Sequence, residues 1–349
     1  MHKIITIEDA ERLVCPVYID VRSPAEFADG HILGAINVPL LENDERALIG
    51  TIYAKQGPDR AKEVGLSVVS PKLPELIQSI KRNAPEERPV VVYCWRGGMR
   101  SKSMVVMLEL AGIHSQQLEG GYKSYRRRVL TRLQDYEFKP EIFVLCGSTG
   151  AGKTLLLKTL LRKNVPVIDL EGLANHRGSV FGQVGLGRQI SAPQFDACLL
   201  EELDKLNQEP FVFVECESKR IGNIYLPDVF FTAMKRGKRM LLETSLEVRI
   251  DRLIKEYEAF SVERADEIIA SLESLQKRLG KKQLGELKDL FAQKKMREFV
   301  RILLINYYDP LYGYEEANKN DQYCFAANGD DLEQAANEIR AFLRNQKRG

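Results

Sequence analysis

The stretch Cys94-Trp95-Arg96-Gly97-Gly98-Met99-Arg100-Ser101 joins two segments of different character. Before it, the apolar run 90–93 predicts a buried strand. After it, residues 103–110 carry apolar side chains at helical spacing. The cysteine therefore lies on a turn between the carboxyl end of a strand and the amino end of a helix. Together with the strands and helices that alternate around it, this turn predicts a parallel α/β domain.

The residues of this turn favour a reactive thiolate at Cys94. Gly97 and Gly98 allow successive backbone N–H groups to face one point, where a helix N-terminus adds positive potential. Arg96 and Arg100 add formal positive charge. Most cysteines are inert core residues, but two glycines and two arginines without apolar periodicity favour a nucleophile here.

The length and composition set limits on the class of protein. A chain of 349 residues predicts two domains, and 44% hydrophobic with 29% charged residues is typical of a soluble globular protein. The net charge of +2 is too small to indicate a partner. The chain has no run of about 18 apolar residues and no signal-like N-terminus, so we expect a cytoplasmic protein without a membrane partner. The six cysteines form no CxxC pair, which favours reduced thiols over a metal site.

A second strand–loop–helix unit follows the domain boundary that we place between 1–135 and 136–349. The apolar strand 142–145 precedes Gly147-Ser148-Thr149-Gly150-Ala151-Gly152-Lys153-Thr154, and an apolar-periodic helix follows. This is the complete G-x4-G-K-T pattern in the context of a P-loop. Its N–H groups bind a phosphate chain, Lys153 reaches the terminal phosphates, and Thr154 can hold Mg²⁺. The pattern does not identify the molecule that carries the phosphates.

Two further segments are candidates to complete the P-loop site. The strand 211–214 is followed by Glu215 and Glu217, whereas the usual Walker B aspartate is missing. One of these glutamates must therefore act as the second carboxylate if any residue does. The long loop 169–188 contains Asn175, His176 and Arg177, and we expect an ordered substrate loop there.

The C-terminal part predicts a helical insertion around 260–305 in the second domain. Residues 277–301 carry nine Lys or Arg against three Asp or Glu. Such a run is usually a solvated helical face, but together with the arginines 126–128 it is also consistent with a path for an RNA backbone. The tyrosines within 307–314 either pack as core or stack on unpaired bases. Arg249 and Arg252, on a predicted helix, are equally consistent with solvent exposure and with phosphate contacts.

Four motifs in the first domain resemble the rhodanese family in order and spacing, and they cover about residues 1–130. These motifs are Asp20-Val21-Arg22, Gly30-His31-Ile32, the cysteine loop and Leu118-Glu119-Gly120-Gly121-Tyr122. The resemblance implies that Cys94 carries a transferable chalcogen. We expect Arg22 and His31 to be structural, with partners among loop carbonyls or, for Arg22, Glu26.

The cysteine loop differs from the rhodanese pattern in its length. Arg100 stands six positions after Cys94, and this C-x5-R spacing resembles the dual-specificity and cell-cycle phosphatases, whose wider loop holds a phosphate. Cys94 then either attacks a phosphate ester or takes sulfur or selenium from a donor that carries a phosphate. The loop alone does not distinguish these alternatives.

Over essentially the whole chain, the sequence resembles the family of bacterial tRNA 2-selenouridine synthases. The resemblance rests on both loops, on the stretch 171–179 (Glu-Gly-Leu-Ala-Asn-His-Arg-Gly-Ser) and on Tyr307-Tyr308-Asp309-Pro310. It implies a selenotransferase with geranyltransferase activity, which replaces sulfur by selenium in wobble 2-thiouridine of tRNA through S-geranyl-2-thiouridine. Geranyl diphosphate and selenophosphate are then the co-substrates, no cofactor is tightly bound, and the partners are tRNA and the synthetase that makes selenophosphate.

On this resemblance, Cys94 serves selenium transfer and the loop from Trp95 to Arg100 binds the donor. Arg96 and Arg100 hold the donor's phosphate, while Gly147 to Thr154 hold the prenyl diphosphate or a nucleotide. Two other classes remain open from the residues alone. One is a C-x5-R phosphatase or P-loop kinase that acts on a small molecule. The other is a nucleotide-gated RNA-binding or sulfur-relay protein.

Overall fold

The computed structural model of the chain describes residues 3–85, 87–258, 264–311 and 323–346. The chain divides into two compact units. Unit 1 comprises Met1–Asp135 and Ser191–Leu200, and unit 2 comprises Tyr136–Ile190 and Glu201–Gly349. Helix α10 (Ala192–Leu206) is thus shared, because its first residues belong to unit 1 and its last residues to unit 2. The sequence carried no signal for this return to unit 1.

Unit 1 is built on a five-stranded sheet with the order β1-β5-β4-β2-β3, in which all neighbouring strands are parallel. Its strands are β1 (Lys3–Ile5), β2 (Val17–Asp20), β3 (Ile36–Asn37), β4 (Val90–Tyr93) and β5 (Ser115–Leu118). The central strand β4 is buried along its whole length, as its unbroken apolar run predicts. The carboxyl end of this strand carries the cysteine loop.

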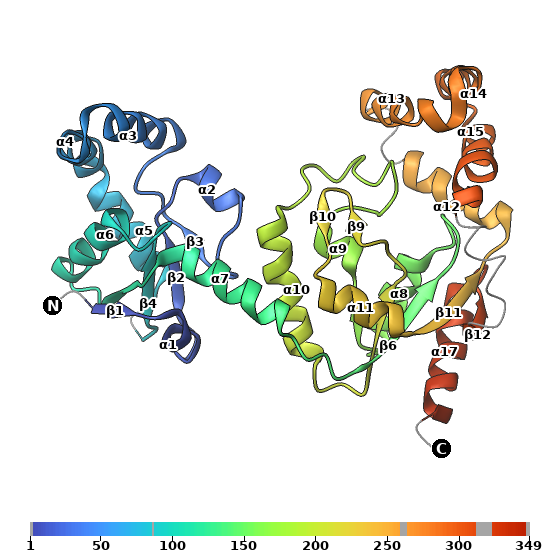
Figure 1. The fold of residues 1–349 in the computed structure, drawn as a ribbon, viewed down its shortest axis with the longest axis horizontal. Helices are drawn as coiled ribbons and strands as arrows, with labels where there is room; N and C mark the ends of the chain where they lie inside the picture. The colour runs from blue at the N-terminus through green and yellow to red at the C-terminus, as the bar shows by residue number, and fades with distance from the viewer. Residues whose placement is uncertain (1–2, 86, 259–263, 312–322, 347–349) are drawn as a thin grey trace. The chain divides into compact units, whose positions relative to one another are not determined.

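Helices cover both faces of this sheet (Figure 1). One apolar cluster joins β2 and β4 to α5 and α6, and the other joins β4 and β5 to α1 and α7. The helices of unit 1 are α1 (Ile7–Glu11), α2 (Pro24–Ala28), α3 (Asn43–Gln56), α4 (Pro58–Val69), the 3₁₀ turn η1 (Ser70–Lys72), α5 (Leu73–Asn83), α6 (Met99–Leu110) and α7 (Gly121–Gln134). The capping box predicted by Ser23 and Glu26 begins α2.

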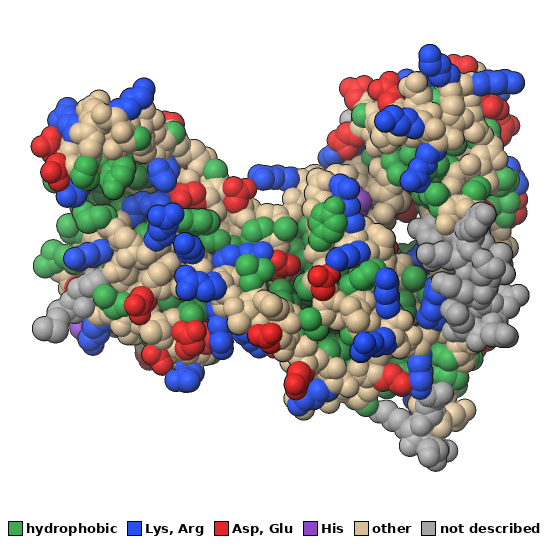
Figure 2. Space-filling view, in the orientation of Figure 1, with side chains coloured by type: hydrophobic (Ala, Val, Ile, Leu, Met, Phe, Trp, Pro, Cys, Tyr) green, Lys and Arg blue, Asp and Glu red, His purple; other side chains and the backbone are tan. Residues whose placement is uncertain are grey.

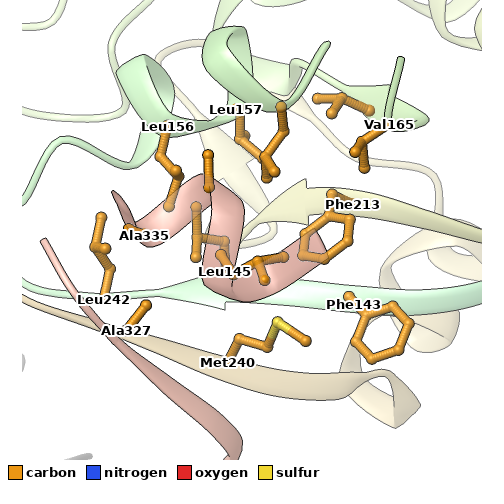
Figure 3. Packing of buried hydrophobic residues seen from close by; sticks show 14 of the residues in the cluster. Phe143, Leu145, Leu156, Leu157, Val165, Phe213, Met240, Leu242, Ala327 and Ala335 are labelled. Carbon is orange, nitrogen blue, oxygen red and sulfur yellow. The ribbon is translucent and has the colours of Figure 1, made fainter. Parts of the chain in front are cut away.

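Unit 2 contains a second parallel sheet, with the order β12-β11-β6-β8-β7. One face packs against α8 and α17, where Leu156, Leu157 and Ala335 meet Phe143, Phe213 and other strand side chains (Figure 3). Its strands are β6 (Glu141–Cys146), β7 (Val167–Ile168), β8 (Phe211–Glu215), β11 (Lys238–Glu243) and β12 (Tyr323–Asn328). Its first helices and its antiparallel hairpin are α8 (Lys153–Arg162), α9 (Leu170–Ala174), β9 (Arg220–Ile221), β10 (Ile224–Tyr225) and α11 (Asp228–Arg236). The parallel α/β fold predicted for both domains is confirmed.

The remaining helices of unit 2 form a separate apolar cluster of their own. They are α12 (Leu246–Glu258), α13 (Ala265–Ser274), α14 (Gln276–Ala292), α15 (Met296–Leu303) and the π-helical turn η2 (Leu304–Tyr308), and the chain closes with α17 (Leu332–Gln346). Tyr307 and Tyr308 are buried in this cluster and so pack as core, whereas Tyr312 and Tyr314 lie outside the described residues. No helix in the described part of the chain is both long and apolar enough to cross a membrane.

Candidate functional site

Cys94 is held at the start of the loop that joins β4 to α6. Its Sγ accepts a hydrogen bond from the N–H of Gly98 at 3.3 Å and lies 3.2 Å from the Oγ of Ser101. Gly97 has a φ of 64°, and a Cβ there would lie 2.7 Å from the carbonyl oxygen of Leu118. A side chain therefore does not fit at this turn, and the chain can curl around the sulfur only with glycine.

Four carbonyl groups of this loop have hydrogen-bond partners elsewhere in unit 1. Those of Cys94 and Trp95 accept from the N–H groups of residues 122 and 123 at 2.8 and 3.0 Å. Those of Gly97 and Gly98 accept from the Gln117 amide at 2.8 and 3.1 Å. The N–H groups of residues 95–97 donate to no backbone carbonyl in the described part of the chain. Unpaired N–H groups on a glycine turn are the donors that anion-binding loops use.

A pocket of about 470 Å³ opens above the sulfur. It is lined by Arg46, Cys94, Trp95, Arg96, Gly98, Met99 and Arg100. Trp95 and Met99 are 42% and 60% exposed although both are apolar. The pocket therefore presents cationic and apolar side chains together beside the sulfur of one cysteine.

Arg100 is fixed by an ion pair with Glu26 of α2. Its two terminal nitrogens lie 2.6 and 3.1 Å from the two carboxylate oxygens. Burial alone would raise the pKa of Glu26, but the hydrogen bond and charge of Arg100 lower it below its usual value. Arg46 also lies 3.6 Å from this carboxylate. Arg96 has no ion-pair partner among the described residues, so its charge is available to a ligand.

Arg22 and His31 have the structural roles expected of them. Arg22 is fully buried, pairs with Asp20 at 2.6 Å and donates to the carbonyl of Gly30 at 2.6 Å. Its partners are therefore the carboxylate of Asp20 and, as expected, a loop carbonyl, whereas Glu26 pairs with Arg100 instead. The His31 ring stacks on Phe27, and its Nδ1 lies 2.9 Å from the carbonyl oxygen of Phe27.

The P-loop of unit 2 follows β6 and turns into α8 at Lys153. Gly150 and Gly152 have φ values of 78° and 93°, which suit glycine and let the backbone wrap around a central point. The Lys153 ammonium donates to the carbonyl oxygen of Gly147 at 2.7 Å. A pocket of about 720 Å³ opens in front of this loop and includes Lys153 and Thr154.

Of the three glutamates that line this pocket, Glu171 and Glu217 lie near the P-loop residues Thr154 and Lys153. The hydroxyl of Thr154 donates to Glu171 at 2.8 Å, and the carboxylate of Glu217 interacts with Glu171. Burial, followed by the charge of Glu171, raises the pKa of Glu217 to about 8. Burial also raises the pKa of Glu171, although Thr154 and Lys153 oppose the shift. Both carboxyl groups therefore ionise less readily than an ordinary glutamate.

Of the two carboxylates predicted from the sequence, only Glu217 lines the pocket. Glu215 is buried under α9, where it accepts the N–H of Glu171 at 2.8 Å, and burial raises its pKa well above the usual range. Glu171, which contacts Thr154, was not singled out from the sequence. Its position three residues after the short strand β7, in the first turn of α9, is the signal that could have identified it, since strand ends meet at one edge of the sheet.

The predicted substrate loop is ordered, and its three residues have different roles. Asn175 and Arg177 line the pocket. The Asn175 amide donates to carbonyl oxygens of Leu186 and Arg188 at 2.9 and 3.1 Å, and Arg177 lies 2.8 Å from Glu256. His176 is buried and does not line the pocket, and its Nδ1 accepts the N–H of Gly178 at 3.1 Å.

Arg249 and Arg252 of α12 donate hydrogen bonds to carbonyl groups of the P-loop. Arg249 is buried, donates to the carbonyl of Thr149 at 2.9 Å and pairs with Asp309. Arg252 donates to the carbonyl of Ala151 at 2.5 Å and also lines the pocket. These side chains fix the carbonyl groups of Thr149 and Ala151 in the loop.

Comparison with known proteins places these two sites in one family. A family model described as the tRNA 2-selenouridine synthase AAA domain matches residues 140–342, and the rhodanese-like domain model matches residues 6–128. The chain belongs to the tRNA 2-selenouridine synthase family. A tRNA 2-selenouridine synthase from Sulfurovum sp. (strain NBC37-1) is 34% identical over 94% of each chain. Another, from Hydrogenovibrio crunogenus (strain DSM 25203 / XCL-2), is 35% identical over 97% of this chain and 98% of that protein.

Among solved structures, the N-terminal domain of a protein from Clostridium difficile 630 matches 37% of this chain and 99% of its own, with 44% identity and a TM-score of 0.36. Both resemblances noted in the sequence, to rhodaneses and to the synthase family, are confirmed. The chain is therefore an enzyme of the tRNA 2-selenouridine synthase type.

The basic run of this synthase lies on α14 and α15. Several of its cations are neutralised within unit 2, since Arg297 and Arg301 both pair with Glu247 and Lys288 pairs with Glu273. On the face in Figure 2, basic and acidic side chains are accordingly interspersed over α13–α15. Lys281 and Lys282 are exposed and have no ion-pair partner in the described part of the chain. A role in RNA binding remains a prediction.

Proposed function

We propose that this protein replaces sulfur by selenium in wobble 2-thiouridine of tRNA. The reaction proceeds in the cytoplasm through S-geranyl-2-thiouridine, with geranyl diphosphate and selenophosphate as co-substrates. The observation that carries the proposal is the presence of two anion cradles in one chain, one with a nucleophilic sulfur and one with a lysine. The names of relatives that span nearly the whole chain support the substrate.

In the first step, the P-loop holds the diphosphate of the prenyl donor. The thiocarbonyl sulfur of 2-thiouridine attacks the first prenyl carbon, the carbon–oxygen bond breaks, and diphosphate leaves with the electron pair. The backbone N–H groups and Lys153 stabilise the charge that develops on this leaving group. Such a step needs no hydrolysis of ATP, which agrees with the missing Walker B aspartate of ordinary ATPases.

The residues around Thr154 suit a magnesium ion. Its hydroxyl, Glu171 and Glu217 offer oxygen atoms at one end of the pocket, and Mg²⁺ takes one or two carboxylates together with phosphate oxygens. The ion would neutralise the leaving diphosphate. Glu171 and Glu217 would then both ionise, because the cation removes their mutual repulsion.

In the second step, Cys94 serves the transfer of selenium from selenophosphate. Arg96 and Arg100 hold the phosphate part of the donor, and Glu26 holds Arg100 in place. Selenium adds to C2 of the S-geranyl nucleoside, and geranyl thiolate leaves with its electron pair. Alkylation makes the sulfur a good leaving group, since the thiolate is stable in water.

The decisive experiment is mass spectrometry of wobble nucleosides after incubation of the protein with thiolated tRNA and both co-substrates. We expect S-geranyl-2-thiouridine when selenophosphate is omitted, and unchanged 2-thiouridine when geranyl diphosphate is omitted. Formation of 2-selenouridine without geranyl diphosphate would contradict the sequence of steps. Release of phosphate from aryl phosphates with no change in the tRNA would favour a small-molecule phosphatase instead.

A further inference from the structure

We propose that Cys94 attacks the phosphorus atom of the selenium donor, forms an S-phosphocysteine and thereby releases hydrogen selenide as the nucleophile for C2. This inference rests on the proposed function for its donor, a selenium atom bound to a phosphoryl group. It assigns Ser101 as a further catalytic residue. The cysteine loop is then a phosphoryl-accepting site and not a carrier of selenium.

The backbone around Cys94 is arranged for a tetrahedral oxyanion. The N–H of Gly98 donates to Cys94 Sγ at 3.3 Å, and four loop carbonyls accept from Tyr122, Lys123 and Gln117. Among the described residues, no N–H group of residues 95–97 donates to a backbone carbonyl. The first N–H groups of α6 are also without helical partners. A phosphoryl group has three equatorial oxygens, and this ring of donors matches them better than it matches a bare selenium atom.

The cations of the pocket fit the same ligand. Arg100 stands six residues after Cys94, and Glu26 engages its two terminal nitrogens at 2.6 and 3.1 Å. The guanidinium is therefore held in one orientation at the mouth of the cradle, with Arg96 beside it. Positive charge at this position stabilises the transition state of phosphoryl transfer.

Ser101 supplies a hydrogen-bond donor for the Cys94 thiolate, which is the leaving group when the phosphocysteine is hydrolysed. Its Oγ is fully buried, lies 3.2 Å from Cys94 Sγ and accepts a hydrogen bond from Gln117 at 2.8 Å. The hydroxyl has one hydrogen to donate, toward the sulfur or toward the carbonyl of Gly98. That carbonyl already accepts from Gln117 and from the N–H of Lys102. When the sulfur is anionic, the hydrogen bond to the sulfur is the stronger one.

The balance of oxidation states also favours attack of the Cys94 thiolate on phosphorus over attack on selenium. Attack of the thiolate on selenium would expel the phosphoryl group with the bonding pair, which gives phosphite and needs an oxidant to return to phosphate. Attack on phosphorus forms the S–P bond and breaks the Se–P bond, and hydrogen selenide leaves with the pair, so no atom changes oxidation state. Selenide then adds to C2 of the S-geranyl nucleoside and expels geranyl thiolate. Water finally attacks the phosphocysteine, the S–P bond breaks, phosphate departs, and the Cys94 thiolate returns with its hydrogen bond from Ser101.

The test uses the full chain with selenophosphate, with and without S-geranyl tRNA, followed by a denaturing quench and intact-mass measurement. We expect one phosphoryl group on the peptide that contains Cys94, and phosphate as the only phosphorus product by ³¹P spectroscopy. The Ser101→Ala variant should slow hydrolysis of the adduct by ~10- to 100-fold, so that the phosphocysteine accumulates. Ser103→Ala makes the same chemical change on α6, away from the sulfur, and should leave the adduct level unchanged.

A selenium adduct on Cys94, phosphite as a product, or 2-selenouridine formation with no phosphoryl adduct in either wild type or Ser101→Ala would overturn the inference. A phosphatase probe separates this failure from failure of the proposed function. With p-nitrophenyl phosphate, phosphocysteine should form whether or not tRNA is a substrate. If that adduct forms while thiolated tRNA stays unmodified, the phosphoryl-accepting site stands and the proposed tRNA reaction does not.

Discussion

Arg100 and Glu26 form a two-point ion pair across the mouth of the cysteine pocket, with contacts of 2.6 and 3.1 Å. Glu26→Gln removes the charge that orients the guanidinium, and a hydrogen bond to a charged group contributes about 1.5–3 kcal/mol. We expect the selenium step to slow about 10-fold while prenyl transfer stays unchanged. Separate assays of the two steps, with Glu45→Gln as a control that breaks the Lys72 pair elsewhere in unit 1, check this. Equal losses in both variants would contradict a role for Glu26 in the site.

Replacement of Cys94 should separate the two reactions. Cys94→Ala removes the nucleophile but leaves the P-loop in unit 2 untouched. We expect no 2-selenouridine, while S-geranyl-2-thiouridine still accumulates on the tRNA. Cys15→Ala, which changes an exposed cysteine of the same unit, is the matched control and should be fully active. Selenium incorporation by the Cys94 variant would show that another group carries this step.

Lys153→Ala should give the opposite result. The long Lys153 side chain can reach the phosphates of a bound ligand. In this structure its ammonium group donates to the carbonyl oxygen of Gly147. Its loss should reduce prenyl transfer at least 100-fold through weaker stabilisation of the leaving diphosphate. Selenium transfer to tRNA that already carries the S-geranyl group should persist. The measurement is nucleoside mass spectrometry with each tRNA substrate, and retained prenyl transfer would refute the assignment of the diphosphate to this loop.

The raised pKa of Glu217 predicts that the free energy of unfolding depends on pH. Its pKa rises from 4.5 to about 8 in the folded protein, so the folded state holds a proton that the unfolded state releases. The stability that this proton contributes is fully present below pH 4.5 and is lost as the pH rises toward about 8. We expect urea unfolding of wild type to show a free energy that falls over this interval more steeply than in Glu217→Gln. Glu243→Gln, at an exposed carboxylate, should keep the wild-type slope.

The unpaired lysines of α14 predict a salt-dependent contribution to RNA binding. Lys281→Gln combined with Lys282→Gln removes two exposed charges that have no ion-pair partner among the described residues. We expect weaker tRNA binding and a salt slope of log K that is smaller by roughly two. The control combines Lys62→Gln with Lys205→Gln, which are already paired with acidic neighbours. Binding isotherms over a series of salt concentrations decide the matter, and an unchanged slope would remove α14 from the interface.

The two loops could be predicted because their information is local. A strand, a glycine turn and a helix N-terminus follow one another in both the Cys94 and the P-loop stretches, and in the structure each lies where the periodicity indicates. The buried strands β4 and β6 are continuous apolar runs, which is the pattern of a parallel sheet covered on both faces. Sequence alone therefore sufficed for the fold class and for the position of both loops between a strand and a helix.

The partners of those cradles could not be predicted, because they come from distant segments. Glu26 reaches Arg100 across 74 positions of the chain, and Glu171 reaches Thr154 only because β7 closes the edge of the second sheet. A two-residue strand such as β7 has no readable periodicity. Burial separated Glu215 from Glu217 as well, although the two stand two positions apart. These assignments depend on packing, which no short motif records.

The division of α10 between the two units has a practical meaning for dissecting the molecule. The hydroxyl of Ser191 donates to the carbonyl oxygen of Asp29, and the side-chain oxygen of Gln194 accepts the N–H of His31. Asp196 pairs with Arg126 at 2.6 Å. A fragment cut after residue 135 would lose these bonds and leave the Arg126 guanidinium without its counter-ion. Unit 1, which carries Cys94, thus includes a segment of chain that is synthesised only after the P-loop. The unit cannot make these bonds on the ribosome until residues 191–200 have emerged.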